Sequence, residues 1–208
     1  RQVVYISKKC MEIYNQPLTN IVFMGMGEPL LNYKNVLRSI HFITSEEGLN
    51  MSYKRITLST SGISKMIRKL ADDNVKVNLA LSLHAANEEL RKKIMPIGKS
   101  NTLEEIRDSL KYYFSKTKKK VTYEYVLLRD VNDSIEDAYQ LYKYTKHLSS
   151  KVNIIEYNAV EGLEFKKSSF EKTEKFIGYL LKKGVNVSLR RSRGKDINAA
   201  CGQLANKN

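Results

Sequence analysis

The sequence predicts an α/β fold built on a parallel sheet, and two observations predict it. Apolar, β-rich runs alternate along the chain with segments whose apolar residues recur every three or four positions. Strands separated by helices form βαβ units with parallel strands. Right-handed crossovers then curl the sheet into a full or partial barrel, or lay it open as a doubly wound sheet. We expect one domain over residues 1–208, because no linker or change of composition interrupts it.

Composition narrows the class of protein. The chain has 208 residues, 42% of them hydrophobic, which suffices for a core. With 10 Gly and 3 Pro it is neither collagen-like nor of low complexity. No run approaches the roughly 20 apolar residues of a membrane span, so we expect no membrane partner. The net charge of +14 favours a polyanionic partner such as nucleic acid. With only two cysteines, we expect a reduced, cytoplasmic protein.

Six strands are expected, in apolar runs that are separated by helical segments. They cover residues 20–24, 55–60, 75–83, 121–128, 152–157 and 185–190. A helical period without a preceding cap opens the chain at Arg1, so we expect the chain to begin inside a helix whose preceding elements are left out.

The helices between the strands have recognisable stripes and ends. Apolar stripes run through Val36–Ile43, Leu103–Tyr113, Ile135–Leu148 and Phe170–Leu181. Thr102, with Glu105 three residues later, predicts a capping box. Asp133 or Ser134 is expected to cap the helix at Ile135, and Gly184 to end the last helix in a left-handed conformation.

The first strand runs into a glycine-rich turn, Gly25-Met26-Gly27-Glu28-Pro29-Leu30. A dinucleotide fingerprint needs a third glycine, and Leu30 stands in its place, so that interpretation fails. The two glycines still allow a ligand to approach the backbone, and Glu28 offers an acceptor at the end of a strand. The alternative is an ordinary turn between a strand and a helix.

Polar residues also end other strands. They are Ser59, Ser82, His84 and Asn158, and each has a structural alternative as a cap, a turn residue or a satisfied histidine. Ligands of barrels and open α/β sheets bind at the carboxyl ends of the strands, where these groups and Glu28 converge. Acceptors, small donors and bare backbone suit a zwitterionic, adenosine-like ligand better than a phosphate, which favours a glycine-rich loop with Lys or Arg.

The two cysteines differ in context. Cys201 lies between Ala and Gly in the tail 191–208, close to several Arg and Lys residues that favour a reactive thiolate. The alternative for Cys201 is a small buried apolar residue, which is the interpretation that we prefer for Cys10. The sequence contains no P-loop and no HExxH, GxSxG or CxxC motif.

Taken in order, the motifs of the chain resemble one family over its whole length. They are VFMGMGEPLLN, RITLSTSG, LALSLHA, IMPI, EYVLL, VNDS, KVNIIEYN and RGKDINAACGQLA. The chain is thereby similar to the RlmN/Cfr family of radical S-adenosylmethionine methyltransferases, which methylate adenine in 23S rRNA and tRNA. The resemblance implies a partial (βα)6 TIM-like barrel of the radical SAM type. It also implies that the first strand and the CxxxCxxC loop, whose cysteines hold a 4Fe-4S cluster, lie upstream of this chain.

The resemblance also implies roles for particular residues. Gly27 and Glu28 match contacts to the methionine part of S-adenosylmethionine, and further cofactor contacts fall on Ser59, Ser82, Leu83, His84 and Asn158. Cys201 matches the catalytic cysteine that carries a methyl group. In the family, one cofactor molecule methylates this sulfur, and the cluster cleaves a second to a radical that activates the methyl for addition to carbon 2 of adenine. None of these 208 residues is expected to bind a metal, and this segment alone is expected to be inactive.

Three alternatives remain at the level of the sequence. A Cfr-like enzyme would methylate carbon 8 in place of carbon 2. A non-catalytic basic RNA-binding module would need no thiol and no cofactor pocket. A phosphate-handling barrel enzyme would bind sugar phosphates, although the missing glycine-rich loop with lysine disfavours it. The expected partners of the methyltransferase are 23S rRNA, tRNA and a cellular electron donor for the cluster.

Overall fold

A computed structural model describes residues 2–160 and 162–190 of the chain, and its described strands form one parallel sheet. Each strand pairs with the next along the chain, in the order β1-β2-β3-β4-β5-β6. Their bounds are β1 Ile21–Phe23, β2 Ile56–Thr60, β3 Asn78–Ser82, β4 Val121–Leu127, β5 Ser150–Glu156 and β6 Val187–Arg190. The predicted strands are thus confirmed, with ends that shift by up to three residues.

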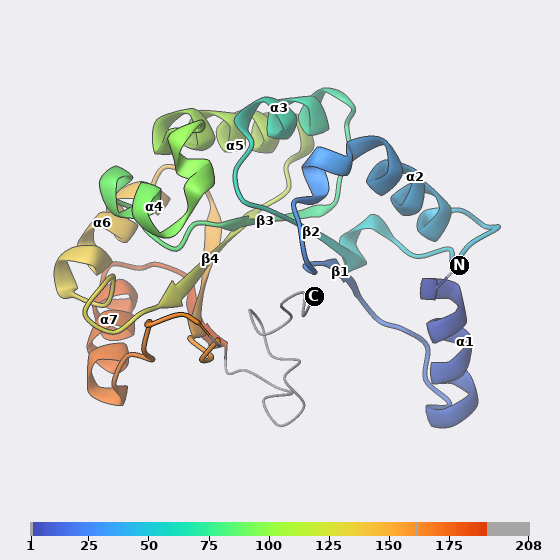
Figure 1. Ribbon diagram of the computed structural model, residues 1–208. Coiled ribbons are helices and arrows are strands. Elements are labelled where there is room, and N and C mark those ends of the chain that lie inside the picture. Colours follow the sequence, from blue (N-terminus) through green and yellow to red (C-terminus); the bar gives the residue numbers. More distant parts are fainter. Residues whose placement is uncertain (1, 161, 191–208) are drawn as a thin grey trace.

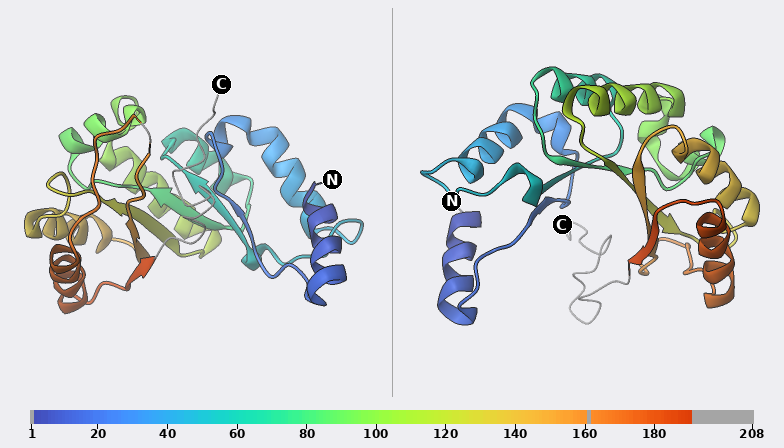
Figure 2. Two further views of the ribbon diagram at one scale, coloured as in Figure 1. Left: turned by 60° about the horizontal axis from the view of Figure 1, so that its bottom comes forward. Right: turned by 180° about the vertical axis from the view of Figure 1, so that it is seen from behind.

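Helices connect the strands and cover the outer side of the sheet. They are α1 Gln2–Tyr14, α2 Tyr33–Thr44, α3 Ser64–Asp72, α4 Glu88–Ile94, α5 Leu103–Thr117, α6 Ile135–Thr145 and α7 Phe170–Lys182, with 3-10 turns η1 Pro29–Asn32, η2 Tyr53–Arg55 and η3 Pro96–Lys99. The sheet curves into an arc with α2 to α7 on its convex side (Figures 1 and 2). Sequential parallel order with helices outside is the architecture of a partial TIM-like barrel, as the sequence predicts.

The helix ends follow the predicted caps. Thr102 and Glu105 form the capping box of α5. Ser134 caps α6 together with Asp137, so Ser134 and not Asp133 is the N-cap. Gly184 follows α7 with φ of 73°, the left-handed conformation in which glycine is favoured.

The main core lies between the convex side of the sheet and the helices. Its centre includes the fully buried side chains of Leu58, Leu79, Tyr123 and Phe176. The β1 edge is different, because Val22 is 54% exposed and α1 has no buried residue. The apolar stripe predicted at the start of the chain therefore adds no buried residue to the core of the described structure, although Val3 packs against it while partly exposed.

Two short helices lie where the apolar pattern named no stripe. In α3 the buried residues are Ile67, Leu70 and Ala71, and in α4 the buried side chain is that of Arg91. Helices of this length span two turns, which is too few for a periodic signal. Both nevertheless position the loops at the carboxyl ends of β2 and β3.

Candidate active site

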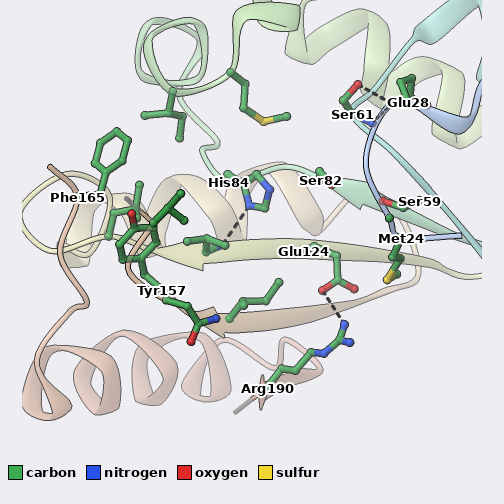
Figure 3. A pocket seen from close by; sticks show the side chains of 18 of the residues that line it. Met24, Glu28, Ser59, Ser61, Ser82, His84, Glu124, Tyr157, Phe165 and Arg190 are labelled. Carbon is green, nitrogen blue, oxygen red and sulfur yellow. Dashed lines mark hydrogen bonds and ion pairs between the residues drawn. The ribbon is translucent and has the colours of Figure 1, made fainter. Parts of the chain in front are cut away.

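A cavity of about 610 Å³ opens on the concave side of the sheet, at the carboxyl ends of the strands (Figure 3). Six of the predicted cofactor-binding residues line it: Gly27, Glu28, Ser59, Ser82, His84 and Asn158. They come from the ends of β1, β2, β3 and β5, so residues far apart in the sequence meet at one edge, as βα topology requires. Cys201 lies outside the described residues.

Glu28 is fixed by three hydrogen bonds at the β1 end of the cavity. Its Oε1 accepts from the Leu30 backbone N–H at 3.0 Å and thereby caps η1. Its Oε2 accepts from the backbone N–H and the hydroxyl of Ser61, both at 2.6 Å. A carboxylate offers about four acceptor positions, so one position remains for a ligand donor. Gly27 precedes it with φ of 83°, which a side chain would strain.

His84 lines the cavity at the carboxyl end of β3 in a left-handed backbone conformation, with φ of 55°. Its Nδ1 accepts from the Val126 backbone N–H at 3.1 Å, so a neutral ring carries its proton on Nε2. Desolvation by burial, and then the nearby Arg91 charge, lower the pKa of His84 to about 4. Near neutral pH this ring is therefore an uncharged hydrogen-bond donor.

Asn132 fixes the backbone around His84. Its Nδ2 donates to the carbonyl oxygens of His84 at 2.7 Å and Val126 at 2.8 Å, while its Oδ1 accepts from the Leu128 N–H at 2.7 Å. The Asn132 side chain is completely buried, and it joins the end of β3 to the end of β4.

Leu83 differs from the other predicted cofactor contacts, because its side chain is fully buried in the hydrophobic core and does not line the cavity. Its carbonyl oxygen accepts from Nε of Arg91 at 3.3 Å, and Nη2 of Arg91 donates to the Ser61 carbonyl oxygen at 2.6 Å. Arg91 therefore ties the loops after β2 and β3 together from behind the cavity. The Leu83 backbone is itself hydrogen-bonded within the fold, because its N–H donates to the Glu124 carbonyl oxygen at 2.9 Å and its carbonyl oxygen also accepts from the Ala85 N–H at 2.7 Å.

The β5 end of the cavity has an apolar wall. The rings of Tyr157 and Phe165 meet edge to face, with centroids 6.3 Å apart, and Val160 and Leu163 lie beside them. Asn158 is 6% exposed at this wall and adds an amide. Flat apolar surface beside a buried amide suits a purine ring, which needs both contact area and a few hydrogen bonds.

The site also depends on residues that the sequence pattern did not single out as site residues, namely Ser61, Asn132, Glu124 and Arg190. Glu124 had a usable signal, since it is a charged residue inside an otherwise apolar strand. Ser61 and Asn132 act through partners 33 and 48 positions away, and nothing local marks such pairs.

A scan against family models matches residues 1–142 to the radical SAM superfamily. Among curated proteins, a probable dual-specificity RNA methyltransferase RlmN from Flavobacterium psychrophilum is 55% identical over 206 residues. That alignment covers 99% of this chain and 59% of the relative. The chain therefore spans about three-fifths of the length of this relative.

Solved structures of radical SAM proteins are also similar to this chain. A radical SAM methyltransferase from Sphaerobacter thermophilus superimposes with a TM-score of 0.93 at 40% identity, covering 97% of this chain and 59% of that one. Streptococcus suis SuiB, solved with S-adenosylmethionine bound, has a TM-score of 0.61 at 16% identity over 92% of this chain and 43% of its own. At that identity the likeness concerns the fold alone.

Proposed function

The chain belongs to the radical SAM superfamily, and from this premise we propose that it is the catalytic portion of an RNA methyltransferase acting on carbon 2 of adenine. The observation that carries the proposal is the 55% identity to an RNA methyltransferase over 99% of the chain. The cavity at the carboxyl ends of the strands supplies a site in which a small-molecule cofactor can bind. We propose further that residues 1–208 form one radical SAM partial-barrel domain.

S-adenosylmethionine fits the residues of the cavity. A volume of about 610 Å³ lies within the range of small-molecule sites. The polar Glu28 end suits the amino acid part, and the apolar wall at Tyr157 and Phe165 suits the adenine. A buried carboxylate oxygen of Glu124 lacks a hydrogen-bond partner among the described residues and faces the space between them.

The proposed roles follow from the geometry. Gly27 lets the ligand approach the backbone, and Glu28 accepts a hydrogen bond from the ligand amine through its remaining lone pair. Ser59 and Ser82 offer hydroxyl groups, and neutral His84 donates from Nε2 without adding charge beside a cationic ligand. Asn158 binds the adenine edge, and Leu83 contributes van der Waals contact through its backbone, whose N–H and carbonyl oxygen are hydrogen-bonded within the fold.

When bound, S-adenosylmethionine supplies the methyl group and, with a 4Fe-4S cluster, the radical chemistry that defines the superfamily. We propose that the Cys201 thiolate accepts the methyl group and presents it to the RNA. Cys201 lies eleven positions after Arg190, which lines the cavity, and a chain of that length reaches at most about 40 Å. Within the described ranges, no group of three or more His, Cys, Asp or Glu residues offers a metal site.

The net charge of +14 supports 23S rRNA and tRNA as substrates, since basic proteins neutralise the phosphate backbone. None of the described helices combines the length and the apolarity that crossing a membrane requires. We place the enzyme in the cytoplasm, where its RNA substrates and a reductant for the cluster are found.

A nucleoside analysis tests the proposal. The protein in its full natural length is reconstituted anaerobically with iron and sulfide and incubated with S-adenosylmethionine, a reductant and either RNA. We expect 2-methyladenosine in the digest and a gain of one CH₂ unit on the Cys201 peptide. Cys201→Ala abolishes both, whereas the matched control Cys10→Ala retains them.

Other products would overturn parts of this account. If 8-methyladenosine appears, the Cfr-like specificity replaces carbon 2. Unmodified RNA, bound equally well by Cys201→Ala, would support a non-catalytic binding module and contradict the enzyme.

A further inference from the structure

A cluster of lysines lies at the amino ends of the strands, opposite the edge at which the cavity opens. Helix α5 ends at Thr117 just before β4, α6 ends at Thr145 before β5, and α7 ends at Lys182 before β6 (Figure 1). Because each helix runs back to the amino end of the next strand, these three helix ends share one rim of the sheet. We refer to the exposed or half-buried lysines there as the lysine rim: Lys111, Lys116, Lys118, Lys119, Lys120, Lys143, Lys146, Lys151, Lys182 and Lys183.

The segments that form the lysine rim contain no acidic residue. Residues 109–123, 138–155 and 176–187 hold all ten lysines and neither Asp nor Glu, and the acidic residues of α5, α6 and α7 precede these segments. The helix dipole favours a cation in the last turn of a helix. It does not explain the whole cluster, because Lys120 lies in the loop before β4 and Lys151 lies within β5.

The positive charges of the lysine rim are not neutralised by neighbouring side chains. None of the ten lysines forms an ion pair with another described residue. Nearer the start of α7, by contrast, Lys172 pairs with Asp130 and Lys175 pairs with Glu171. A dense group of unpaired cations on one surface attracts a polyanion.

Tyrosine rings hold several of these lysines close together. Nζ of Lys183 lies 5.8 Å from the ring centroid of Tyr142 on α6 and 5.7 Å from that of Tyr179 on α7. Nζ of Lys146 lies 6.0 Å from the same Tyr142 centroid. A ring attracts an ammonium group without cancelling its charge. These contacts therefore gather positive charge on a surface that spans α6 and α7.

Helices α5 and α6 share the same positive field. Desolvation, and then the charges of Lys111 and Lys146, lower the pKa of His147. Lys111 lies on α5 and Lys146 directly follows α6, so lysines from both helices act on this imidazole. At α3 the surface changes in character, because Asp72 there accepts a hydrogen bond from the Tyr112 hydroxyl.

We propose that the lysine rim binds the phosphate backbone of RNA, as a second contact surface remote from the cavity. This inference rests on the proposed function, which makes a large RNA the substrate. The seven residues of β4 place the rim about 20 Å from the cavity edge, so the RNA at the rim is not the reacting nucleotide. Ammonium groups contact phosphates as point charges and do not distinguish bases, so this contact is independent of sequence.

Salt-dependent RNA binding tests the proposal. Dissociation constants for bulk tRNA are measured by fluorescence anisotropy over a series of KCl concentrations, with the protein in its full natural length and its cluster reconstituted. The rim variant combines four substitutions at exposed positions: Lys116→Gln, Lys120→Gln, Lys146→Gln and Lys183→Gln. The control variant removes the same charge from exposed lysines of α1 to α4: Lys8→Gln, Lys34→Gln, Lys65→Gln and Lys93→Gln.

We expect the rim variant to weaken tRNA binding by about tenfold or more. The slope of log K against log salt should fall by about three, since each lost phosphate contact removes roughly 0.7 to 0.9. The control variant retains the wild-type slope. Equal losses in the two variants, or no loss in the rim variant, would overturn the rim assignment while leaving the proposed function intact. If the wild type does not bind tRNA, both proposals fail.

Vesicles of phosphatidylglycerol test the competing polyanion, a lipid surface. If the rim variant loses vesicle binding but keeps tRNA binding, the lysine rim faces a membrane and the RNA assignment is overturned. Binding of S-adenosylhomocysteine should stay unchanged in both variants, because every substitution lies outside the cavity.

Folding of the variants is checked by circular dichroism. If the rim variant does not fold, a second variant built from other members of the lysine rim replaces it: Lys111→Gln, Lys143→Gln, Lys151→Gln and Lys182→Gln. The same loss of affinity and of salt dependence is expected of this second variant.

Discussion

At the β1 end of the cavity the Glu28 carboxylate is held by three hydrogen bonds, whereas at the β3 end the His84 ring is held by one hydrogen bond and by burial. The β1 end lies at a weakly packed edge of the sheet, where Val22 is 54% exposed. The β3 end rests on the centre of the sheet, where Leu79 and Leu81 are fully buried. The comparison teaches that the Glu28 carboxylate, on a weakly packed edge, is oriented by donors to the carboxylate itself, whereas the His84 ring is held mainly by burial and its backbone by the buried side chain of Asn132.

The largest effect is expected at Asn132, which supports the β3 end. Asn132→Ala removes the side-chain partner of three backbone groups, the buried N–H of Leu128 and the partly buried carbonyl oxygens of His84 and Val126. We expect it to lower the free energy of unfolding by about 4 kcal/mol. Urea denaturation measures this, with exposed Asn35→Ala as the control. A loss below about 1 kcal/mol would show that burial alone holds this end.

Gly62 and Gly27 allow a comparison between a tightly packed and an open part of the backbone. Gly62 has φ of 101°, and a Cβ there would lie 2.8 Å from Cδ1 of Ile106. Gly27 has φ of 83°, but its Cβ would meet nothing within 4 Å. We expect Gly62→Ala to cost about 3 kcal/mol and Gly27→Ala about 1 kcal/mol, because only the first adds overpacking to backbone strain. Equal losses in thermal unfolding would contradict this account.

The pH dependence of stability tests the burial of His84. Its pKa is about 4 in the folded chain against 6.5 without perturbation, so below pH 6.5 the unfolded chain binds a proton that the folded chain does not. Stability present above pH 6.5 is therefore lost progressively as the pH falls towards 4. We expect this residue to account for about 2 kcal/mol of the loss, discounted because the ring is partly open to the cavity.

His84→Asn removes this titration and tolerates the left-handed backbone. The difference in unfolding free energy between pH 7 and pH 4 should shrink by that amount in the variant. His41→Asn on exposed α2 keeps the wild-type decline. Identical pH profiles for the wild type and His84→Asn would show that the ring is solvated.

The smallest effect is expected at the β1 end. Ser61→Ala removes one of the three donors to Glu28, while the Ser61 backbone N–H remains. We expect a loss of about 1 kcal/mol in stability and a several-fold weaker binding of S-adenosylmethionine, because the carboxylate gains freedom. Calorimetry measures both, with the exposed Ser39→Ala as the control. Unchanged binding would mean that the two backbone donors, the N–H groups of Leu30 and of residue 61, suffice to orient Glu28.

The parts of the fold that the sequence predicted are those encoded locally. The segment 121–128 consists of β-branched, aromatic and other apolar residues apart from Glu124, and the Thr102 and Ser134 caps lie three residues from their partners. The sequence therefore predicted β4, α5 and α6. By contrast, α3 is only nine residues long and gave no periodic signal. The apolar stripe of α1 predicted a helix, but such a stripe does not specify which other element covers its apolar face.

The residues of the candidate site also fall into those that the sequence predicted and those that it did not. Glu28, Ser82 and His84 were predictable, because parallel topology brings strand ends together whatever the contacts between side chains. Their supports were not, since Glu28 meets Ser61 across 33 positions and Glu124 meets Asn153 across 29. Such pairs depend on strand register, and periodicity does not specify which side chains meet between neighbouring strands.

Hydrogen–deuterium exchange with and without S-adenosylmethionine tests most directly the claim that the carboxyl ends of the strands form the cofactor site. We predict slower exchange in peptides covering residues 24–30, 59–62, 82–86 and 124–128, at the carboxyl ends of β1 to β4, and no change in the outer helices α5 and α6. Protection confined to the outer helices, or none at saturating ligand, would contradict the assignment of this cavity.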